Sequence, residues 1–291
     1  MILVTGASGT VGRAVLEEVR KTGQRAKAMY RDAQDAKRGA QGVETVVADF
    51  ADKPSLKRAL SGAEVVFLVC SPIPQLVELE SNVIDVARDA GAKHMVLNSA
   101  LGAADYPKSF PSWHRKVEDK LKSSGLGYTI LRPNSFLQNI VAFVAPSIRS
   151  EGVYYAAMGD AKLSFIDVRD IAAVAAKILA SPQGHAGKAY ELNGPEALNY
   201  SQVVERISRV TGAPARFVDI PEDAQRKAMR DLGMPEWQVT ALLDLQRYYT
   251  AERKGGEVTG VTQQLLGCPL IGLDQFLQEN KDSFRGQAAG A

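Results

Sequence analysis

The sequence predicts an α/β protein built on a doubly wound parallel sheet, with a smaller α/β substrate domain after it. Short, almost continuously apolar runs alternate with helical stretches as far as Leu131, which is typical of parallel strands covered by helices on both faces. Three glycines, Gly6, Gly9 and Gly12, directly follow the first apolar run. Beyond Pro133 the alternation fades, which indicates the second domain.

The segment Met1–Gly12 and the residues after it predict a strand, a tight turn and a helix that together bind a dinucleotide. Ile2–Val4 is the strand, and Val11, Val15 and Val19 recur at helical spacing. Glycines let the backbone turn sharply and approach a ligand closely, while the free N–H groups and positive dipole end of the helix suit a pyrophosphate. The strand before and the helix after the glycines favour this interpretation over an ordinary turn.

Five further strands are expected in the sheet, at Arg25–Tyr30, Glu44–Ala48, Val65–Val69, His94–Leu97 and Tyr128–Leu131. Helices are expected between them at Lys53–Leu60, Gln75–Ala90 and Pro111–Ser123. In a doubly wound sheet the ligand binds where the carboxyl ends of the strands meet. We therefore expect one crevice lined by the residue pairs that end these strands: Thr5–Gly6, Tyr30–Arg31, Asp49–Phe50, Cys70–Ser71, Asn98–Ser99 and Arg132–Pro133.

The residues after the second strand distinguish the two dinucleotides. An acidic residue there accepts from the ribose 2′-OH of NAD, whereas a basic residue favours the 2′-phosphate of NADP. If the strand ends at Tyr30, Arg31 is the first side chain available over the ribose, and Asp32 caps the next helix. We therefore expect NADP(H) rather than NAD(H), the alternative for Arg31 being a solvated surface charge.

The second domain is expected to be interleaved with the first. Residues 1–132 form the dinucleotide-binding domain, and residues 160–190 return to it, because Ser164–Asp170 leads into an apolar helix over Ile171–Leu179. Residues 133–159 and 191–286 form the smaller substrate-binding domain, expected to cover the nicotinamide end of the crevice, and Gln287–Ala291 is expected to be a frayed tail.

Composition excludes several classes of function. Lys and Arg number 35 against 33 Asp and Glu, and a net charge of +2 is too small to indicate a nucleic-acid or anionic-membrane partner. No apolar run approaches the roughly 20 residues that span a bilayer, and the start of the chain lacks a secretory-signal pattern. The separated Cys70 and Cys268 fit a reducing compartment, so we expect a cytoplasmic protein, monomeric or homodimeric. No cluster of residues has metal-ligand spacing, so no metal site is expected.

Several motifs carry a resemblance to a known family. The sequence resembles the NmrA-like group of atypical short-chain dehydrogenases/reductases at Val4–Gly12, Asp49, Tyr128–Asn134, Phe165–Ala172, Leu192–Glu196 and Tyr200. Members of that group include NAD(P)H-dependent quinone, triphenylmethane-dye and azo reductases, and redox-sensing proteins that bind NADP without turnover. The resemblance implies a Rossmann fold with a small C-terminal substrate domain, and it favours NADP.

The resemblance also reveals a departure from the wider superfamily. That superfamily uses Tyr-x-x-x-Lys, with the tyrosine as proton donor and the lysine holding the nicotinamide ribose. Aligned through Glu118 and Leu121, this chain has Phe110 in place of the tyrosine and His114 in place of the lysine. A histidine followed four residues later by glutamate is typical of the quinone- and dye-reducing branch. The missing acid argues against epimerases, dehydratases and alcohol dehydrogenases.

His114, Ser99 and Tyr106 are the candidate catalytic residues. His114 is expected to hydrogen-bond ribose or substrate, the alternative being a satisfied histidine on an amphipathic helix, and Lys116 is expected to be solvated. Tyr106 is the nearby tyrosine that could replace the lost acid. The candidate cofactor-binding residues are Gly6, Ser8, Gly9, Thr10, Val11, Gly12, Arg31, Asp49, Phe50, Cys70, Ser71, Asn98, His114, Pro133 and Phe136.

Two functions follow from these expectations. The first is an NAD(P)H-dependent reductase that transfers hydride to a small planar aromatic acceptor of the quinone, azo or triphenylmethane type. Such electron-poor acceptors develop little anionic charge that demands a positioned acid, so positioning supplies most of the catalysis. The second is a redox sensor that binds NADP(H) without chemistry.

Overall fold

The computed structural model describes residues 1–39 and 42–285, so the expected tail at Gln287–Ala291 lies outside the described residues. The chain divides into two units. The first comprises Met1–Pro133 and Val168–Leu192, and the second comprises Asn134–Asp167 and Asn193–Ala291.

The first unit contains a seven-stranded sheet in the order β3-β2-β1-β4-β5-β6-β8, with every neighbouring pair parallel. Its strands are β1 (Ile2–Val4), β2 (Ala26–Tyr30), β3 (Glu44–Val47), β4 (Val65–Leu68), β5 (His94–Asn98), β6 (Gly127–Pro133) and β8 (Lys188–Leu192). The doubly wound parallel sheet and its first six strands are confirmed. Because all the strands point the same way, their carboxyl ends lie at one edge, as the sequence predicts.

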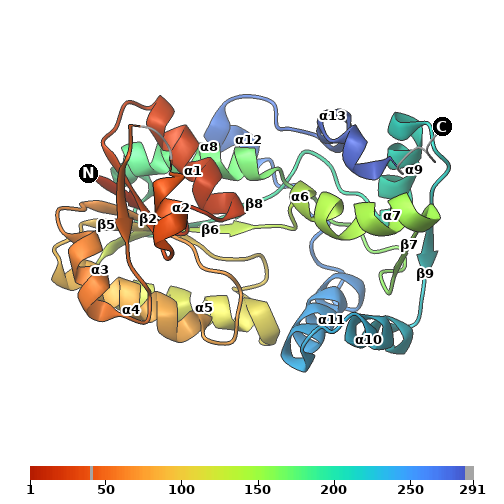
Figure 1. Cartoon of the computed structure of the whole chain (residues 1–291), viewed down its shortest axis with the longest axis horizontal. Helices are drawn as coiled ribbons and strands as arrows, with labels where there is room; N and C mark the ends of the chain where they lie inside the picture. Colours follow the sequence, from red (N-terminus) through yellow and green to blue (C-terminus); the bar gives the residue numbers. More distant parts are fainter. Residues whose placement is uncertain (40–41, 286–291) are drawn as a thin grey trace. The chain divides into compact units, whose positions relative to one another are not determined.

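Helices cover both faces of this sheet (Figure 1). One face carries α1 (Thr10–Lys21) packed against α8 (Val168–Ala180), and the other carries α3 (Lys53–Leu60), α4 (Leu76–Asp89) and α5 (Ser109–Lys122) in succession. The short α2 (Ala33–Lys37) follows β2, and a 3₁₀ turn, η2 (Pro182–His185), precedes β8. The core between the sheet and α3–α5 consists of fully buried aliphatic side chains such as Leu3, Leu56, Ile84, Leu97 and Leu121. This apolar packing fixes the strand ends that position the candidate site.

The return of the chain to the sheet differs from the expectation. Residues 160–167 belong to the second unit, and β8 rather than Ser164–Asp170 extends the sheet beside β6. The backbone N–H groups of Ser164 and Ile166 donate to Gly255 and Ser135, so this segment uses its hydrogen bonds within the second unit. Helix α8 then begins three residues earlier than expected, at Val168.

The second unit contains a two-stranded parallel sheet of β7 (Val153–Ala156) and β9 (Arg216–Asp219). Tyr154, Tyr200 and Phe217 pack their rings over this sheet with centroids 5.1 to 6.1 Å apart. Strand β7 and the helices just before it were not predicted from the sequence. The helical elements are α6 (Leu137–Asn139), the π-helix η1 (Ile140–Val144), α7 (Ala145–Glu151), α9 (Tyr200–Thr211), α10 (Glu222–Asp231), α11 (Glu236–Thr250), α12 (Val261–Leu266), α13 (Leu273–Glu279) and η3 (Lys281–Phe284).

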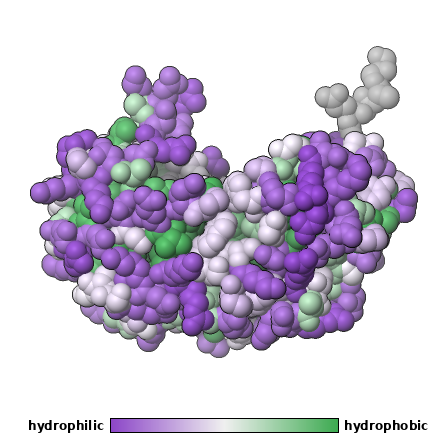
Figure 2. Space-filling model, turned by 90° about the horizontal axis from the view of Figure 1, so that it is seen from below, coloured by the Kyte–Doolittle hydropathy of each residue, from purple (hydrophilic) through white to green (hydrophobic). Residues whose placement is uncertain are grey.

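The surface is mostly polar. Figure 2 shows a largely hydrophilic face on which apolar side chains occupy limited areas. Exposed large apolar side chains include Phe143 and Leu232, at 63% and 85% exposure. Within residues 1–39 and 42–285, none of the helices has the length and apolar character needed to cross a bilayer.

A polar chain joins β5, β6 and η2. The hydroxyl of Thr129 donates to the carbonyl of His185 over 2.9 Å, so it can only accept from Nε2 of His94, which lies 2.9 Å away. The Nε2 atom of His94 therefore carries the proton. Burial and the neighbouring His185 lower the pKa of His94. The unfolded chain consequently binds more protons below about pH 6.5, and the free energy of unfolding falls as the pH drops through that range.

Replacement of Thr129 by valine should break this chain without changing its volume. Thr129→Val leaves the N–H of His94 without an acceptor and removes the donor to His185, so the free energy of unfolding should fall by about 1–3 kcal/mol. Urea denaturation at pH 7 measures the change. Thr45→Val on β3, where the side chain is exposed, is the matched control and should change stability by less than ~0.5 kcal/mol. Equal effects of the two substitutions would contradict the assignment.

Candidate active site

The glycine-rich turn, Gly6–Gly12, joins β1 to α1 and leaves the helix start open. Gly9 is the N-cap residue of α1, and no side chain caps the helix. Gly6 has φ of 58°, in the left-handed region that favours glycine, and a Cβ on Gly12 would lie 2.2 Å from the carbonyl oxygen of Gly6. The turn and the close approach of helix to strand therefore require glycine at both positions. Ser8, Gly9 and Thr10 are exposed, so the N–H groups of the first helical turn can meet an anion.

The ends of β1 and β4 are tied together beside this turn. Val69 donates its backbone N–H to Oγ1 of Thr5 over 3.0 Å, and the N–H of Thr5 donates to the carbonyl of Phe67 over 3.0 Å. Cys70 and Ser71 follow directly, with the thiol half-buried and Ser71 exposed. The structure thus brings both predicted residues to the same sheet edge as the glycine-rich turn.

The residues after β2 and β3 occupy the places that the sequence predicts. Asp32 is the N-cap of α2 and accepts from the backbone N–H groups of Gln34 and Asp35, which confirms its expected capping role. Arg31 is exposed at the end of β2 and is close enough to influence the pKa of Cys70. After β3, Asp49 is exposed and accepts from the N–H of Ala51 over 2.8 Å, and Phe50 is half-buried.

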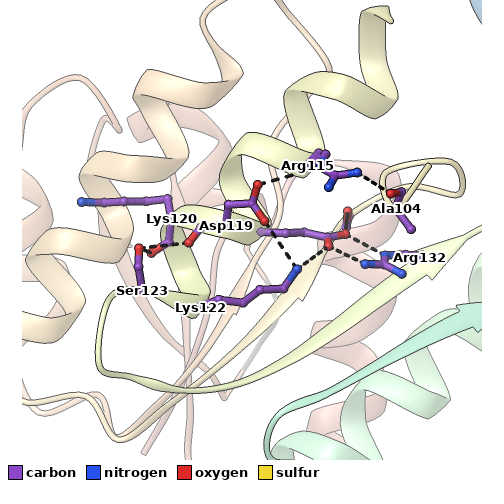
Figure 3. A network of polar contacts seen from close by, with 9 residues as sticks. Ala104, Arg115, Asp119, Lys120, Lys122, Ser123 and Arg132 are labelled. Carbon is purple, nitrogen blue, oxygen red and sulfur yellow. Dashed lines mark hydrogen bonds and ion pairs between the residues drawn. The ribbon is translucent and has the colours of Figure 1, made fainter. Parts of the chain in front are cut away.

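The carboxyl end of β5 is held by a buried carboxylate on α5. Glu118, with a side chain 1% exposed, accepts from Nε and Nη2 of Arg132 over 2.8 and 2.6 Å. It also accepts from the hydroxyl of Ser99 over 2.7 Å and from Lys122 over 3.3 Å. Figure 3 shows Arg132 of β6 and Lys122 of α5 reaching the same carboxylate, with Arg115 nearby bonded to the carbonyl of Ala104.

The electrostatics of Glu118 follow from these contacts. Burial acts to raise its pKa, but hydrogen bonds from Arg132 and Ser99 and the charges of Arg132 and Lys122 outweigh it and hold the pKa below its usual range. Glu118 is therefore an ionised anchor. It fixes Ser99, a predicted catalytic residue, in place.

His114 lies one helical turn before Glu118 and is also buried. Burial lowers its pKa to about 4, against a smaller opposing effect of Glu118, so the imidazole is neutral at pH 7. Its Nδ1 atom is buried and has no hydrogen-bond partner among the described residues. A neutral imidazole cannot supply the cationic charge of the lysine that it replaces. Lys116 is exposed, as expected.

The other candidates around α5 are placed as follows. Phe110 is buried and packs edge-on against Trp113 with ring centroids 5.3 Å apart, so this position holds an aromatic ring without a hydroxyl. Tyr106 is buried in the turn after β5, where its backbone N–H donates to Gly102 over 2.8 Å. Asn98, the last residue of β5, has a buried Oδ1 without a hydrogen-bond partner in the described part of the chain.

The last residue of β6 and the residues after it belong to different units. Pro133 ends the first unit and accepts from the N–H of Leu101 over 3.0 Å, whereas Phe136 lies in the second unit, half-buried and bridged to Ile166. Asn134, between them, is 2% exposed, and its side chain binds Ser164 and Gly255 over 2.8 Å each. The side chain of Asn134 therefore stabilises the second unit.

A buried carboxyl group beside Cys70 was not anticipated from the sequence. Glu80 on α4 is fully buried, and neither of its oxygens has a hydrogen-bond partner among the described residues. Burial raises its pKa to about 8, against a smaller opposing effect of the backbone amide of Cys70. Burial, and then the charge of Glu80, raise the pKa of the Cys70 thiol to about 12. Both groups are therefore protonated at pH 7.

Across residues 1–39 and 42–285, no group of three or more His, Cys, Asp or Glu side chains is arranged to hold a metal ion. The candidate site of the first unit consists of the glycine-rich turn and the carboxyl ends of β2, β3, β4, β5 and β6. It combines an uncapped helix start with the ionised, fully paired Glu118 and the neutral His114.

The sequence matches a known family. A model of the NmrA-like family matches residues 1–277. The chain belongs to the NmrA-like family. An NAD(P)H azoreductase of Xenophilus azovorans is 34% identical to it over 286 residues, which cover 98% of this chain and 99% of that protein.

Solved structures of similar proteins support the fold. The NADPH-dependent quinone oxidoreductase of Escherichia coli, crystallised with NADPH, superposes with a TM-score of 0.88 at 30% identity, covering 96% of this chain and 99% of that chain. The triphenylmethane reductase of Citrobacter sp., complexed with NADP(H), has a TM-score of 0.86 at 22% identity, covering 96% and 99%. This NmrA-like chain therefore has the Rossmann fold that the sequence predicts.

The neutral state of Glu80 predicts a pH-dependent stability. Because its pKa of about 8 in the folded chain exceeds the ~4.3 of an exposed glutamate, the folded chain binds more protons between these values. The free energy of unfolding should therefore fall as the pH rises through this window. For the wild type, the free energy of unfolding should fall by about 2–3 kcal/mol between pH 5 and pH 7 because of this group. The side chain in Glu80→Gln cannot ionise, so this decrease should be absent from that variant.

Urea denaturation of the wild type and of Glu80→Gln at several pH values measures this difference. The exposed Glu78 lies on the same helix, so Glu78→Gln is the matched control and should follow the wild-type curve. Parallel pH curves for wild type and Glu80→Gln would show that Glu80 is ionised in the folded chain.

Proposed function

We propose that this NmrA-like chain is an NADPH-dependent reductase that transfers hydride to quinone-, azo- or triphenylmethane-type aromatic acceptors. One observation carries the proposal: a complete glycine-rich turn stands at the same sheet edge as a β5–α5 region without the proton donor of alcohol chemistry. Phe110 replaces the tyrosine, and His114 is neutral. The chain is equipped to bind a dinucleotide and lacks the acid–base pair that acts at a substrate oxygen.

The residues present fit a bound dinucleotide. A Cβ at Gly12 would overlap the Gly6 carbonyl, and the uncapped start of α1 offers N–H groups to the pyrophosphate. Arg31 is exposed after β2, where its guanidinium can meet a 2′-phosphate. The neighbouring Asp32 uses Oδ1 to accept both capping bonds of α2. Oδ1 of Asn98 and Nδ1 of His114 are buried and have no partner among the described residues, which suits them to the nicotinamide end. When bound, the dinucleotide supplies the hydride.

The choice of acceptor follows from the missing acid. A triphenylmethane cation needs only a hydride to become its neutral product, whereas a quinone or azo group takes a hydride and then a proton, which water can deliver. Neither route requires a positioned donor with a pKa near 7. His114, as a neutral imidazole, binds and orients ligand rather than carrying charge. The similar azoreductase and quinone oxidoreductase support this acceptor class.

The acceptor class can be tested by following NADPH oxidation with quinones, azo dyes and triphenylmethane dyes. We expect steady turnover with at least one class, and we expect His114→Phe to lower kcat/KM by about tenfold, since it removes one hydrogen bond to ligand. Exposed Lys116→Ala on the same helix is the control and should retain activity. Tight NADPH binding without turnover of any acceptor would instead support the redox-sensor function.

Arg31 is the residue expected to select NADPH over NADH. Arg31→Ala should weaken NADPH binding by about 10- to 100-fold, the value of charged hydrogen bonds to a phosphate, and leave NADH binding unchanged. Titration calorimetry with both dinucleotides measures the ratio. Arg20→Ala, an exposed arginine in the last turn of α1, removes the same charge far from the helix start and should change neither affinity. An unchanged ratio in Arg31→Ala would assign the 2′-phosphate to another residue.

A further inference from the structure

The direction of one hydrogen bond determines what the carboxyl end of β5 can offer a ligand. The hydroxyl of Ser99 lies 2.7 Å from Oε1 of Glu118. A carboxylate only accepts, and this one also receives Nε and Nη2 of Arg132 and Nζ of Lys122. Four donors on two oxygens, three of them from cations, keep Glu118 ionised. The single proton of Ser99 is therefore committed to Glu118.

Ser99 has only lone pairs left for any other partner. Its neighbour Asn98 has a buried Oδ1 atom that lacks a donor among the described residues, and Nδ1 of His114 is buried and unpartnered within the same residues. Ser99 and Asn98 are 2% and 7% exposed. A buried acceptor without a donor destabilises the folded chain, so Oδ1 of Asn98 favours a ligand that brings N–H or O–H groups. The remaining lone pairs of Ser99 accept from the same kind of group.

We propose that Asn98 and Ser99 form a hydrogen-bond acceptor site for a ligand group that donates N–H or O–H, and that Glu118 is the positioning residue that keeps Ser99 in its accepting orientation. The proposal rests on the proposed reductase function, because that function supplies the ligands. Ser99 cannot then stabilise a developing oxyanion, which needs a donor. A serine at this strand end can polarise a substrate by donating a hydrogen bond, whereas the hydroxyl of Ser99 accepts one.

Two ligand groups have the required chemistry. The carboxamide of the nicotinamide ring donates two N–H groups, and the reduced acceptor, a hydroquinone or a hydrazine, donates O–H or N–H. The first source makes the site part of cofactor recognition. The second makes it part of the recognition of the reduced product.

Binding measurements with matched ligand pairs test both sources without turnover. In one arm, titration calorimetry compares NADP⁺ with its acetylpyridine analogue, in which a methyl group replaces the carboxamide NH₂. In the other arm, a hydroquinone is compared with its dimethyl ether in the presence of NADP⁺. We expect the donating member of one pair to bind about three- to tenfold more tightly, as one or two net hydrogen bonds predict.

The variants assign this preference to the residues. Ser99→Ala should reduce the preference towards unity, and Glu118→Gln should weaken it, because a neutral amide holds the Ser99 proton less firmly. Ser123 is an exposed serine at the C-terminal end of α5, the helix that carries Glu118, so Ser123→Ala should retain the full preference. Thermal unfolding of each variant separates a loss of folding from a loss of recognition.

Each outcome decides between the possibilities. Equal binding of the two ligands in both pairs by the wild type overturns the acceptor site. A preference that persists in Ser99→Ala also overturns it. Both results leave the proposed reductase function intact. Failure of NADP⁺ to bind at all overturns the proposed function itself. A preference in only one arm supports the site and identifies its ligand as cofactor or product.

Discussion

The buried carboxylate of Glu118 is the interaction on which the candidate site depends. Removal of a charge from water costs several kcal/mol unless its partners replace the solvent, and here Arg132, Ser99 and Lys122 do so. These contacts join α5 to the ends of β5 and β6. The same helix carries His114 one turn earlier, so the position of the imidazole follows from the anchoring of Glu118.

A second constraint fixes the other end of the site. Helix α1 approaches β1 so closely that Gly12 has no room for a side chain, and this approach aims the uncapped helix start at the sheet edge. The two constraints have different consequences for chemistry. The glycine-rich turn offers N–H groups to an anion, whereas Glu118 is ionised and His114 is neutral at pH 7, so neither is a source of a proton. A chain with both properties is suited to hydride transfer that does not depend on an enzyme acid.

The sequence predicted the parts of the fold that local patterns determine. Apolar runs and glycine spacing located β1 to β6, and Asp32 was recognised as a helix cap. The error at Ser164–Asp167 has a different origin, because its backbone partners in the second unit are distant in sequence. The hydrogen bond that Ser99 donates to Glu118 was not predicted for the same reason, because the two residues are far apart in sequence. An arginine in an apolar strand, Arg132, was the available signal that a buried anion lay nearby.

Glu80 and Glu118 show how the surroundings of a buried carboxyl group determine its ionisation state. Both carboxyl groups are buried within the first unit, but Glu118 has four donors while Glu80 has no hydrogen-bond partner among the described residues. The first is ionised and the second is neutral at pH 7. Neutrality at Glu80 spares the adjacent sheet edge an extra negative charge, which would oppose a polyanionic dinucleotide. The ionised group instead lies where cations enclose it, so its charge is compensated before any ligand arrives.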